Sequence, residues 1–276
     1  MGLGGGSGGS GVVGALRGAM GQLAAGGSGA AGPTTLGELA ARDGASHMFL
    51  FASGDPWADS IGSDTLTPKN GAARIESDIG GCQGALDLTG ATSDFATFDQ
   101  SSDWGRDADR TWEFVFHFNG GAPGGSKCLF MLGLAYNTAN MPIQLTSEYG
   151  GHGSSTKLRV QGPGWTDLFD GDGDLLLPGI DYSDATLDGK TFYLAVSFDS
   201  STGEIQAWHK KTGDGSEATG GVVSVSALAA SSGTAHLGGN QTNIASMANL
   251  EIHHVAVFPS VISEALRIER HTMLGI

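Results

Sequence analysis

Strict alternation of apolar and polar residues is the feature that most constrains the fold of this chain. Residues 111–118, TWEFVFHF, carry an aromatic side chain at every second position, beginning with Trp112. Residues 191–198, TFYLAVSF, repeat the pattern with apolar side chains. Side chains two positions apart share one face of a β-strand, whereas a helix would scatter them. Both segments are therefore predicted to be strands that build a core with one face.

Weaker alternation predicts further strands at 47–52, 85–89, 94–98 and 250–258, and within KCLFMLGL, TKLRVQ and VVSVS. Turn sequences rich in Gly, Asp and Ser separate them, and 47 glycines supply the backbone freedom that tight turns need. Many short strands without alternating helices predict an all-β fold, either a two-layer antiparallel sandwich or a barrel. A parallel α/β fold is disfavoured.

Three regions follow from these patterns. Residues 1–33 form a Gly-, Ala- and Ser-rich N-terminal anchor or tail, residues 34–45 a short helical connector, and residues 46–276 the β domain. In the connector, Thr35 and Glu38 have the spacing of a capping box, which predicts a helix of about two turns. A second short helix is expected over 263–272, with Ser263 as its N-cap.

The N-terminal region is too poor in large apolar side chains to fold alone. A few apolar residues do recur at near-helical spacing and could anchor a short helix on a partner: Val12, Val13, Leu16, Met20 and Leu23. A flexible tail is the alternative. A membrane-active helix is a third reading, and Arg17 and the short length count against it.

Charge and hydropathy exclude several classes of function. The chain has 14 Lys and Arg against 29 Asp and Glu, a formal charge of −15, which would repel nucleic acid and anionic lipid. No apolar run approaches the roughly 18 residues of a membrane span. The N-terminus also lacks the pattern of a secretory signal, since no basic residue precedes its apolar part. The two cysteines, Cys82 and Cys128, are expected to be free thiols, with a single bridge left open.

Several stretches resemble laminin-G-like domains, which belong to the concanavalin-A-like jelly-roll class. ADSIG (58–62) followed by GALDLTG (84–90) is similar to the family's opening, and residues 189–215 to its central hairpin. HLGGN (236–240) resembles the strand with paired glycines, and IHHVAVFPSVIS (252–263) the closing strand. The resemblance implies a two-layer antiparallel β-sandwich (jelly roll) that binds carbohydrate or protein. His253 and His254 replace the acidic pair common in the closing strand, which puts a calcium site there in doubt.

Catalytic machinery is not expected. Glycoside hydrolases need two carboxylates across a cleft, and the Glu-x-Asp-x-x-Glu run of the family's hydrolases does not occur here. Glu113 and Glu251 are single strand carboxylates expected to point at solvent. His253 and His254 are adjacent, so their rings are expected on opposite faces of a strand. The scattered histidines are expected to be structural: His117, His152, His209 and His236.

Two sets of residues could bind a ligand. Asp170, Asp172 and Asp174 stand two apart, as oxygen ligands do in calcium loops, although an acidic turn is the alternative and no cofactor is required. The other set consists of loop aromatics that could stack on a sugar, anchor an interface or cap the core: Trp57, Trp104, Tyr149 and Trp165.

The leading functional hypothesis is a non-enzymatic virion structural protein of a bacteriophage, such as a capsid decoration, fibre or tail-associated protein. Its N-terminus would bind other virion proteins, as a homo-oligomer or as part of a large assembly, and its sandwich would serve assembly or bind a cell-surface glycan. A recognition fold without an export signal motivates this setting, because lysis releases phage proteins. The alternatives are a bacterial lectin-like carbohydrate-binding module, extracellular or at the cell surface, and a glycan-processing enzyme.

Overall fold

The computed structural model describes part of the chain, namely residues 32–89, 94–99, 104, 108–119, 127–131, 144–147, 158–161, 187–220, 222–224, 234–239 and 250–276. For 127–131, 144–147, 158–161 and Val223 it describes the backbone alone. The chain divides into two units, Met1–Gly32 and Pro33–Ile276, and every element named below belongs to the second. The predicted anchoring residues of the N-terminal region lie outside the described residues.

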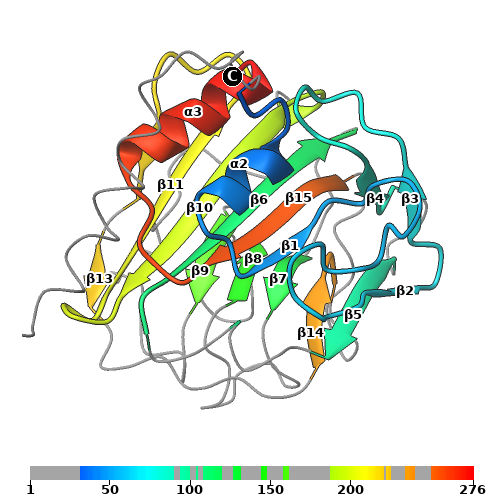
Figure 1. The fold of residues 1–276 in the computed structure, drawn as a ribbon, viewed down its shortest axis with the longest axis horizontal. Coiled ribbons are helices and arrows are strands. Elements are labelled where there is room, and N and C mark those ends of the chain that lie inside the picture. Colours follow the sequence, from blue (N-terminus) through cyan, green and yellow to red (C-terminus); the bar gives the residue numbers. More distant parts are fainter. Residues whose placement is uncertain are drawn as a thin grey trace, which may run out of the picture. The chain divides into compact units, whose positions relative to one another are not determined.

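Two antiparallel sheets form a β-sandwich, as the sequence predicted (Figure 1). The nine-stranded sheet has the order β12-β11-β10-β6-β15-β4-β3, with β1 also paired to β15 and β13 to β11. Its strands are β1 (His47–Phe49), β3 (Ala73–Ile75), β4 (Ala85–Asp87), β6 (Arg110–Phe118), β10 (Thr191–Asp199), β11 (Glu204–Lys211), β12 (Ala218–Thr219), β13 (Val223–Ser224) and β15 (Leu250–Phe258).

The six-stranded sheet has the order β2-β5-β14-β7-β8-β9. Its strands are β2 (Thr67–Lys69), β5 (Phe95–Asp99), β7 (Lys127–Met131), β8 (Gln144–Ser147), β9 (Leu158–Gln161) and β14 (Thr234–Leu237). β2 and β3 were not expected from the sequence, because each is three residues long and β2 contains Pro68, which cannot donate to a ladder.

The main core lies between the sheets and contains the alternating aromatic residues. β6 is paired with β10 on one side and β15 on the other, so its inward side chains meet those of both neighbours. The rings of Phe116 and Phe192, which are register partners, stack with centroids 5.2 Å apart. The predicted inward faces of 111–118 and 191–198 are therefore confirmed.

The opposite face of the nine-stranded sheet is also buried, which the sequence analysis did not anticipate. Helices α2 (Leu36–Arg42) and α3 (Glu264–Leu274) lie over this face (Figure 1) and form a second apolar cluster with it. The capping box of Thr35 and Glu38 and the N-cap of Ser263 are present as predicted. Glu113, which contacts Arg270 of α3, is 0% exposed, and Glu251, which contacts Asn119 and His253, is 8% exposed. The prediction that these carboxylates face solvent was therefore wrong.

A β-bulge in β15 overturns the prediction for the paired histidines. The register with β6 shifts between Ile252 and His254, which leaves His253 without its own partner position. A bulge places two residues of one strand opposite one of the other and interrupts the alternation of faces. His253 and His254 consequently both contact carboxylates on the helix-covered face, those of Glu251 and Glu113.

Cys82 is a free thiol, as expected, and burial raises its pKa to about 12. The side chain of Cys128 lies outside the described residues. Neither α2 nor α3 is long and apolar enough to cross a membrane.

Candidate functional site

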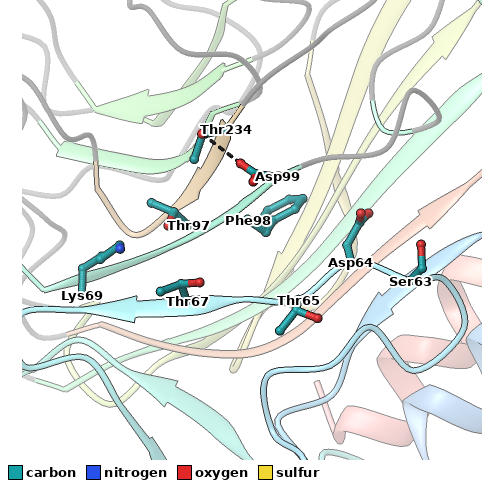
Figure 2. Close-up of a pocket in the computed structure, with 9 residues that line it drawn as sticks. All are labelled: Ser63, Asp64, Thr65, Thr67, Lys69, Thr97, Phe98, Asp99 and Thr234. Atoms are coloured by element: carbon teal, nitrogen blue, oxygen red, sulfur yellow. Dashed lines mark hydrogen bonds between the residues drawn. The ribbon is translucent and has the colours of Figure 1, made fainter.

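A polar pocket lies at the edge of the six-stranded sheet formed by β2, β5 and β14 (Figure 2). Its volume of about 490 Å³ is within the usual range of small-molecule sites. Hydroxyl and charged side chains dominate its lining, which consists of Ser63, Asp64, Thr65, Thr67, Lys69, Thr97, Phe98, Asp99 and Thr234.

Strand register brings the pocket side chains together. Thr97 of β5 is the register partner of Thr67 on β2, and Asp99 is the partner of Thr234 on β14. The alternate residues of these strands, such as Ala96 and Ala235, point into the core. Thr67, Thr97, Asp99 and Thr234 therefore lie on the outer face of the sheet, where the Thr234 hydroxyl donates to Asp99 Oδ1 at 3.1 Å. Phe98, which also lines the pocket, belongs to the core.

The lining can exchange several hydrogen bonds with one small ligand. Each threonine hydroxyl both donates and accepts, the carboxylates of Asp64 and Asp99 accept, and the ammonium of Lys69 donates. These groups suit a ligand with many hydroxyls better than an apolar one. Sequence analysis missed this site because isolated threonines on short strands carry no motif, and only the register places them side by side.

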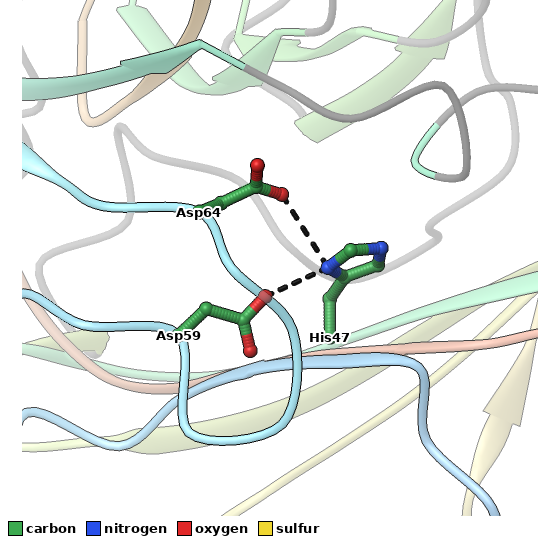
Figure 3. Close-up of side chains that lie close together, drawn as sticks. All are labelled: His47, Asp59 and Asp64. Carbon is green, nitrogen blue, oxygen red and sulfur yellow. Dashed lines mark hydrogen bonds and ion pairs between the residues drawn. The ribbon is translucent and has the colours of Figure 1, made fainter.

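A buried cluster of His47, Asp59 and Asp64 adjoins the pocket, and Asp64 belongs to both (Figure 3). His47 Nδ1 lies 2.7 Å from Asp59 Oδ2 and 3.4 Å from Asp64 Oδ2. The indole N–H of Trp104 donates to Asp64 Oδ2 at 2.5 Å, and its ring centroid is 5.1 Å from that of His47. β1 supplies His47, and the turn before β2 supplies both carboxylates.

Asp59 is the anchor of that turn and belongs to the ADSIG segment. Its Oδ1 accepts backbone N–H groups from Met48, Ile61 and Gly62 at 2.9, 3.0 and 2.8 Å. Burial alone would raise the pKa of Asp59, but the hydrogen bonds from His47 and from these N–H groups hold it below its ordinary value. A Cβ atom on Gly62 would collide with Asp59 and His47, so the turn requires glycine there.

The three ligand atoms of this cluster lie within 4.8 Å of one another, so the cluster could hold a divalent ion. Calcium prefers six to eight oxygen ligands, whereas an imidazole nitrogen with two carboxylates suits a first-row transition metal better. The protein's own donors already engage Asp59 Oδ2 and Asp64 Oδ2. The predicted calcium residues Asp170, Asp172 and Asp174 lie outside the described residues.

The loop aromatics proposed as ligand contacts have different positions. Trp104 is 0% exposed and packs against Phe49 and Phe98, so it belongs to the core and is not available as a surface contact. Trp57 is partly buried against the same core. Tyr149 and Trp165 lie outside the described residues.

Two hydrogen-bonded networks lie on the helix-covered face. Glu113 is bonded to Tyr193, His254 and Arg270, and Arg270 continues to Asp43 at 2.9 Å. Burial would raise the pKa of Glu113, but the charge of Arg270 and the His254 bond lower it.

The second network runs from Ser77 Oγ to His253 Nδ1 at 2.8 Å, and from His253 Nε2 to Glu251 Oε2 at 3.1 Å. Serine, histidine and carboxylate follow in the order of a nucleophile, base and orienting acid. Ser77 Oγ, however, also accepts the N–H of Ile79 at 3.1 Å, and His253 is 1% exposed. The network therefore joins segment 77–79 to the bulged strand.

The sequence matches no family model and no curated protein. The fold is similar to that of solved structures. Domain 4 of AbnA, an extracellular GH43 arabinanase from Geobacillus stearothermophilus, in complex with arabinotriose, has a TM-score of 0.53 at 12% identity, with 82% of this chain and 97% of that chain covered.

A mutant of Trypanosoma rangeli sialidase that displays trans-sialidase activity has a TM-score of 0.51 at 15% identity, with 90% of this chain and 34% of that chain covered. The botulinum neurotoxin serotype D binding domain has a TM-score of 0.50 at 10% identity, with 84% and 52% covered. The chain thus spans about a third of the sialidase. These likenesses show a shared β-sandwich fold.

Proposed function

We propose that residues 33–276 are a non-catalytic carbohydrate-binding module and that the polar pocket is its binding site. The observation that carries the proposal is the row of hydroxyl and charged side chains that β2, β5 and β14 present around a cavity of about 490 Å³. A sugar ring carries hydroxyls on all sides, so a site of this kind can satisfy several of them at once.

The fold gives this proposal independent support. The arabinanase domain is described in complex with arabinotriose, so a β-sandwich of this type holds a carbohydrate in at least one protein. At 12% identity the likeness does not transfer a binding site, and the pocket here is argued from its own residues.

The two carboxylates of the pocket, Asp64 and Asp99, fit a role in binding a sugar better than a role in hydrolysing it. A glycosidase needs one carboxyl that donates a proton and a second that attacks or activates water. Asp64 accepts the Trp104 N–H and Asp99 accepts the Thr234 hydroxyl, so both oxygens act as acceptors. A glycan-processing enzyme remains the competing proposal, and hydrolysis of a bound oligosaccharide that Asp99→Asn abolishes would establish it.

The biological setting is part of the proposal. The Gly-, Ala- and Ser-rich residues 1–33 would anchor the module to other virion proteins of a bacteriophage, and the sandwich would bind a cell-surface glycan. The acidic charge of −15 supports a partner other than nucleic acid. The alternative setting is a bacterial lectin-like module, extracellular or at the cell surface, which would bind carbohydrate in the same pocket and would not be part of a virion.

A glycan array with the full chain tests binding, and calorimetry on the best oligosaccharide tests the site. Thr97→Val removes one pocket hydroxyl at nearly constant volume and should weaken binding about tenfold, the cost of roughly one hydrogen bond left unmade. Thr219→Val, on an exposed strand of the other sheet, is the matched control and should bind as the wild type does. Equal affinity for all three proteins would move the site elsewhere.

A further inference from the structure

A buried histidine beside the pocket has no hydrogen-bond partner on either ring nitrogen. His236 of β14 is 1% exposed, and both Nδ1 and Nε2 lack partners. The buried nitrogens without a hydrogen-bond partner in the described ranges include both ring nitrogens of His236 and one ring nitrogen each of His209, His254 and His271. Buried donors and acceptors without partners destabilise a folded protein, so evolution rarely leaves them without a compensating role.

The position of His236 connects it to the pocket. His236 is the register partner of Thr97, and Thr97 is the register partner of Thr67. Thr234, two residues earlier on β14, also lines the pocket, while Ala235 and Leu237 point into the core. Because register partners have Cβ atoms about 5 Å apart, Thr67, Thr97 and His236 form one row across the outer face of the sheet.

The chemical state of His236 suits a hydroxyl ligand. Burial lowers its pKa to about 4, so the ring is neutral near pH 7 and offers one donor and one acceptor. The ring of Phe95 lies beside it, with centroids 6.1 Å apart. A hydroxyl group is likewise one donor and an acceptor, so a single hydroxyl can engage whichever nitrogen it reaches.

We infer that His236 is a specificity-determining residue of the pocket, which forms a hydrogen bond with one hydroxyl of a bound neutral sugar. His236 does not itself line the pocket, but its register partner Thr97 does, so the hydroxyl would have to reach the ring past the Thr97 side chain. This inference rests on the proposed carbohydrate-binding function and extends it to the residue that selects among sugars.

The test combines two measurements on His236→Phe, which keeps a ring and removes both nitrogens. Without ligand, urea unfolding at pH 7 should show a free protein at least as stable as the wild type, because two unpartnered polar atoms are gone. With the oligosaccharide selected on the array, calorimetry should show affinity reduced by about tenfold or more. His236→Gln, which retains a donor and an acceptor, should recover part of the affinity.

A matched control is His253→Phe. That histidine is equally buried, but both its nitrogens have partners and it lies on the other sheet. Its replacement should reduce stability and leave the affinity unchanged. A series of singly deoxygenated sugars completes the test. One member should bind the wild type more weakly than the parent sugar does. The same member and the parent sugar should bind His236→Phe with equal affinity.

The outcomes separate the two proposals. If the wild type binds no glycan, the carbohydrate-binding function is wrong and this inference falls with it. If the wild type binds and His236→Phe binds equally well, only the inference about His236 is overturned. Loss of both stability and affinity in His236→Phe would assign the ring a structural role and would also overturn it.

Discussion

Glu113 holds the buried polar network on the helix-covered face of the sandwich. Its carboxylate is 0% exposed and faces Arg270, whose side chain is also 0% exposed. Glu113→Gln would leave the guanidinium of Arg270 without its main counter-charge in the interior. We expect a loss of about 3–5 kcal/mol in the free energy of unfolding, the usual cost of breaking a buried ion pair.

Urea denaturation at pH 7 measures this loss. Glu204→Gln, at the exposed start of β11, serves as the control and should change stability by less than about 0.5 kcal/mol. Similar stability in the two variants would show that the Glu113 network does not hold the helices to the sheet.

Buried neutral histidines make the protein sensitive to mild acid. Burial lowers the pKa of both His236 and His271 to about 4, below the ordinary value of 6.5. Lys210 and Arg267 contribute at His271, while Glu113 opposes them. Between pH 6.5 and 4 the unfolded chain binds protons that the folded chain does not, so stability falls as the pH falls, by about 1.4 kcal/mol per pH unit for each histidine.

Urea midpoints at pH 7, 6 and 5 measure this slope. His271→Phe should reduce the dependence of stability on pH by about 1.4 kcal/mol per pH unit between pH 6.5 and 4, the contribution of one histidine. Above pH 7 the wild type and the variant should show the same slope. A wild-type stability that is flat from pH 7 to 5 would contradict the burial of these rings as neutral groups.

At the scale of the element, the turn between Asp59 and Asp64 depends on Gly62. An added Cβ would meet the Asp59 carboxylate and would lie 2.5 Å from His47 Nδ1. Gly62→Ala should therefore cost about 2 kcal/mol or more, through loss of the Asp59 hydrogen bonds. Gly215→Ala, where a Cβ has open space, is the control.

Thermal unfolding distinguishes the two glycine variants. Gly62→Ala should lower the Tm by several degrees and also weaken glycan binding, because Asp64 lines the pocket. If Gly62→Ala were as stable as Gly215→Ala, the ADSIG turn would be less rigid than its hydrogen bonds indicate.

The elements differ in how far the sequence predicted them. The inward faces of β6 and β10 could be predicted because apolar residues at every second position indicate a β-strand with one face in the core. The bulge at His253 could not be predicted. His253 and His254 are both polar, so the alternation of apolar and polar residues does not show where the strand register shifts. The burial of Glu113 depends on where α2 and α3 dock, and a single strand contains no information about that contact.

The candidate site was hidden for a related reason. Thr67, Thr97 and Thr234 come from three distant segments, and only long-range strand pairing makes them neighbours. For the loop aromatics the sequence left ligand contact and core packing open, and Trp104, a large side chain that is 0% exposed, belongs to the core.

At the scale of the whole molecule, the proposal assigns separate tasks to the two parts of the chain. Deletion of residues 1–33 should leave glycan affinity unchanged and abolish incorporation into virions. Mass spectrometry of purified phage particles carrying the full or the shortened chain measures incorporation. Equal incorporation of both forms would contradict an N-terminal anchor.

The central claim is that the pocket at the edge of the six-stranded sheet binds a sugar. The most direct measurement is an amide NMR titration of the full, deuterated chain with the oligosaccharide selected on the array. The account predicts that the largest shifts fall on residues 63–69, 97–99 and 234–236, and that Thr97→Val reduces them at equal sugar concentration. Shifts confined to other parts of the sandwich, with this region unchanged, would contradict it.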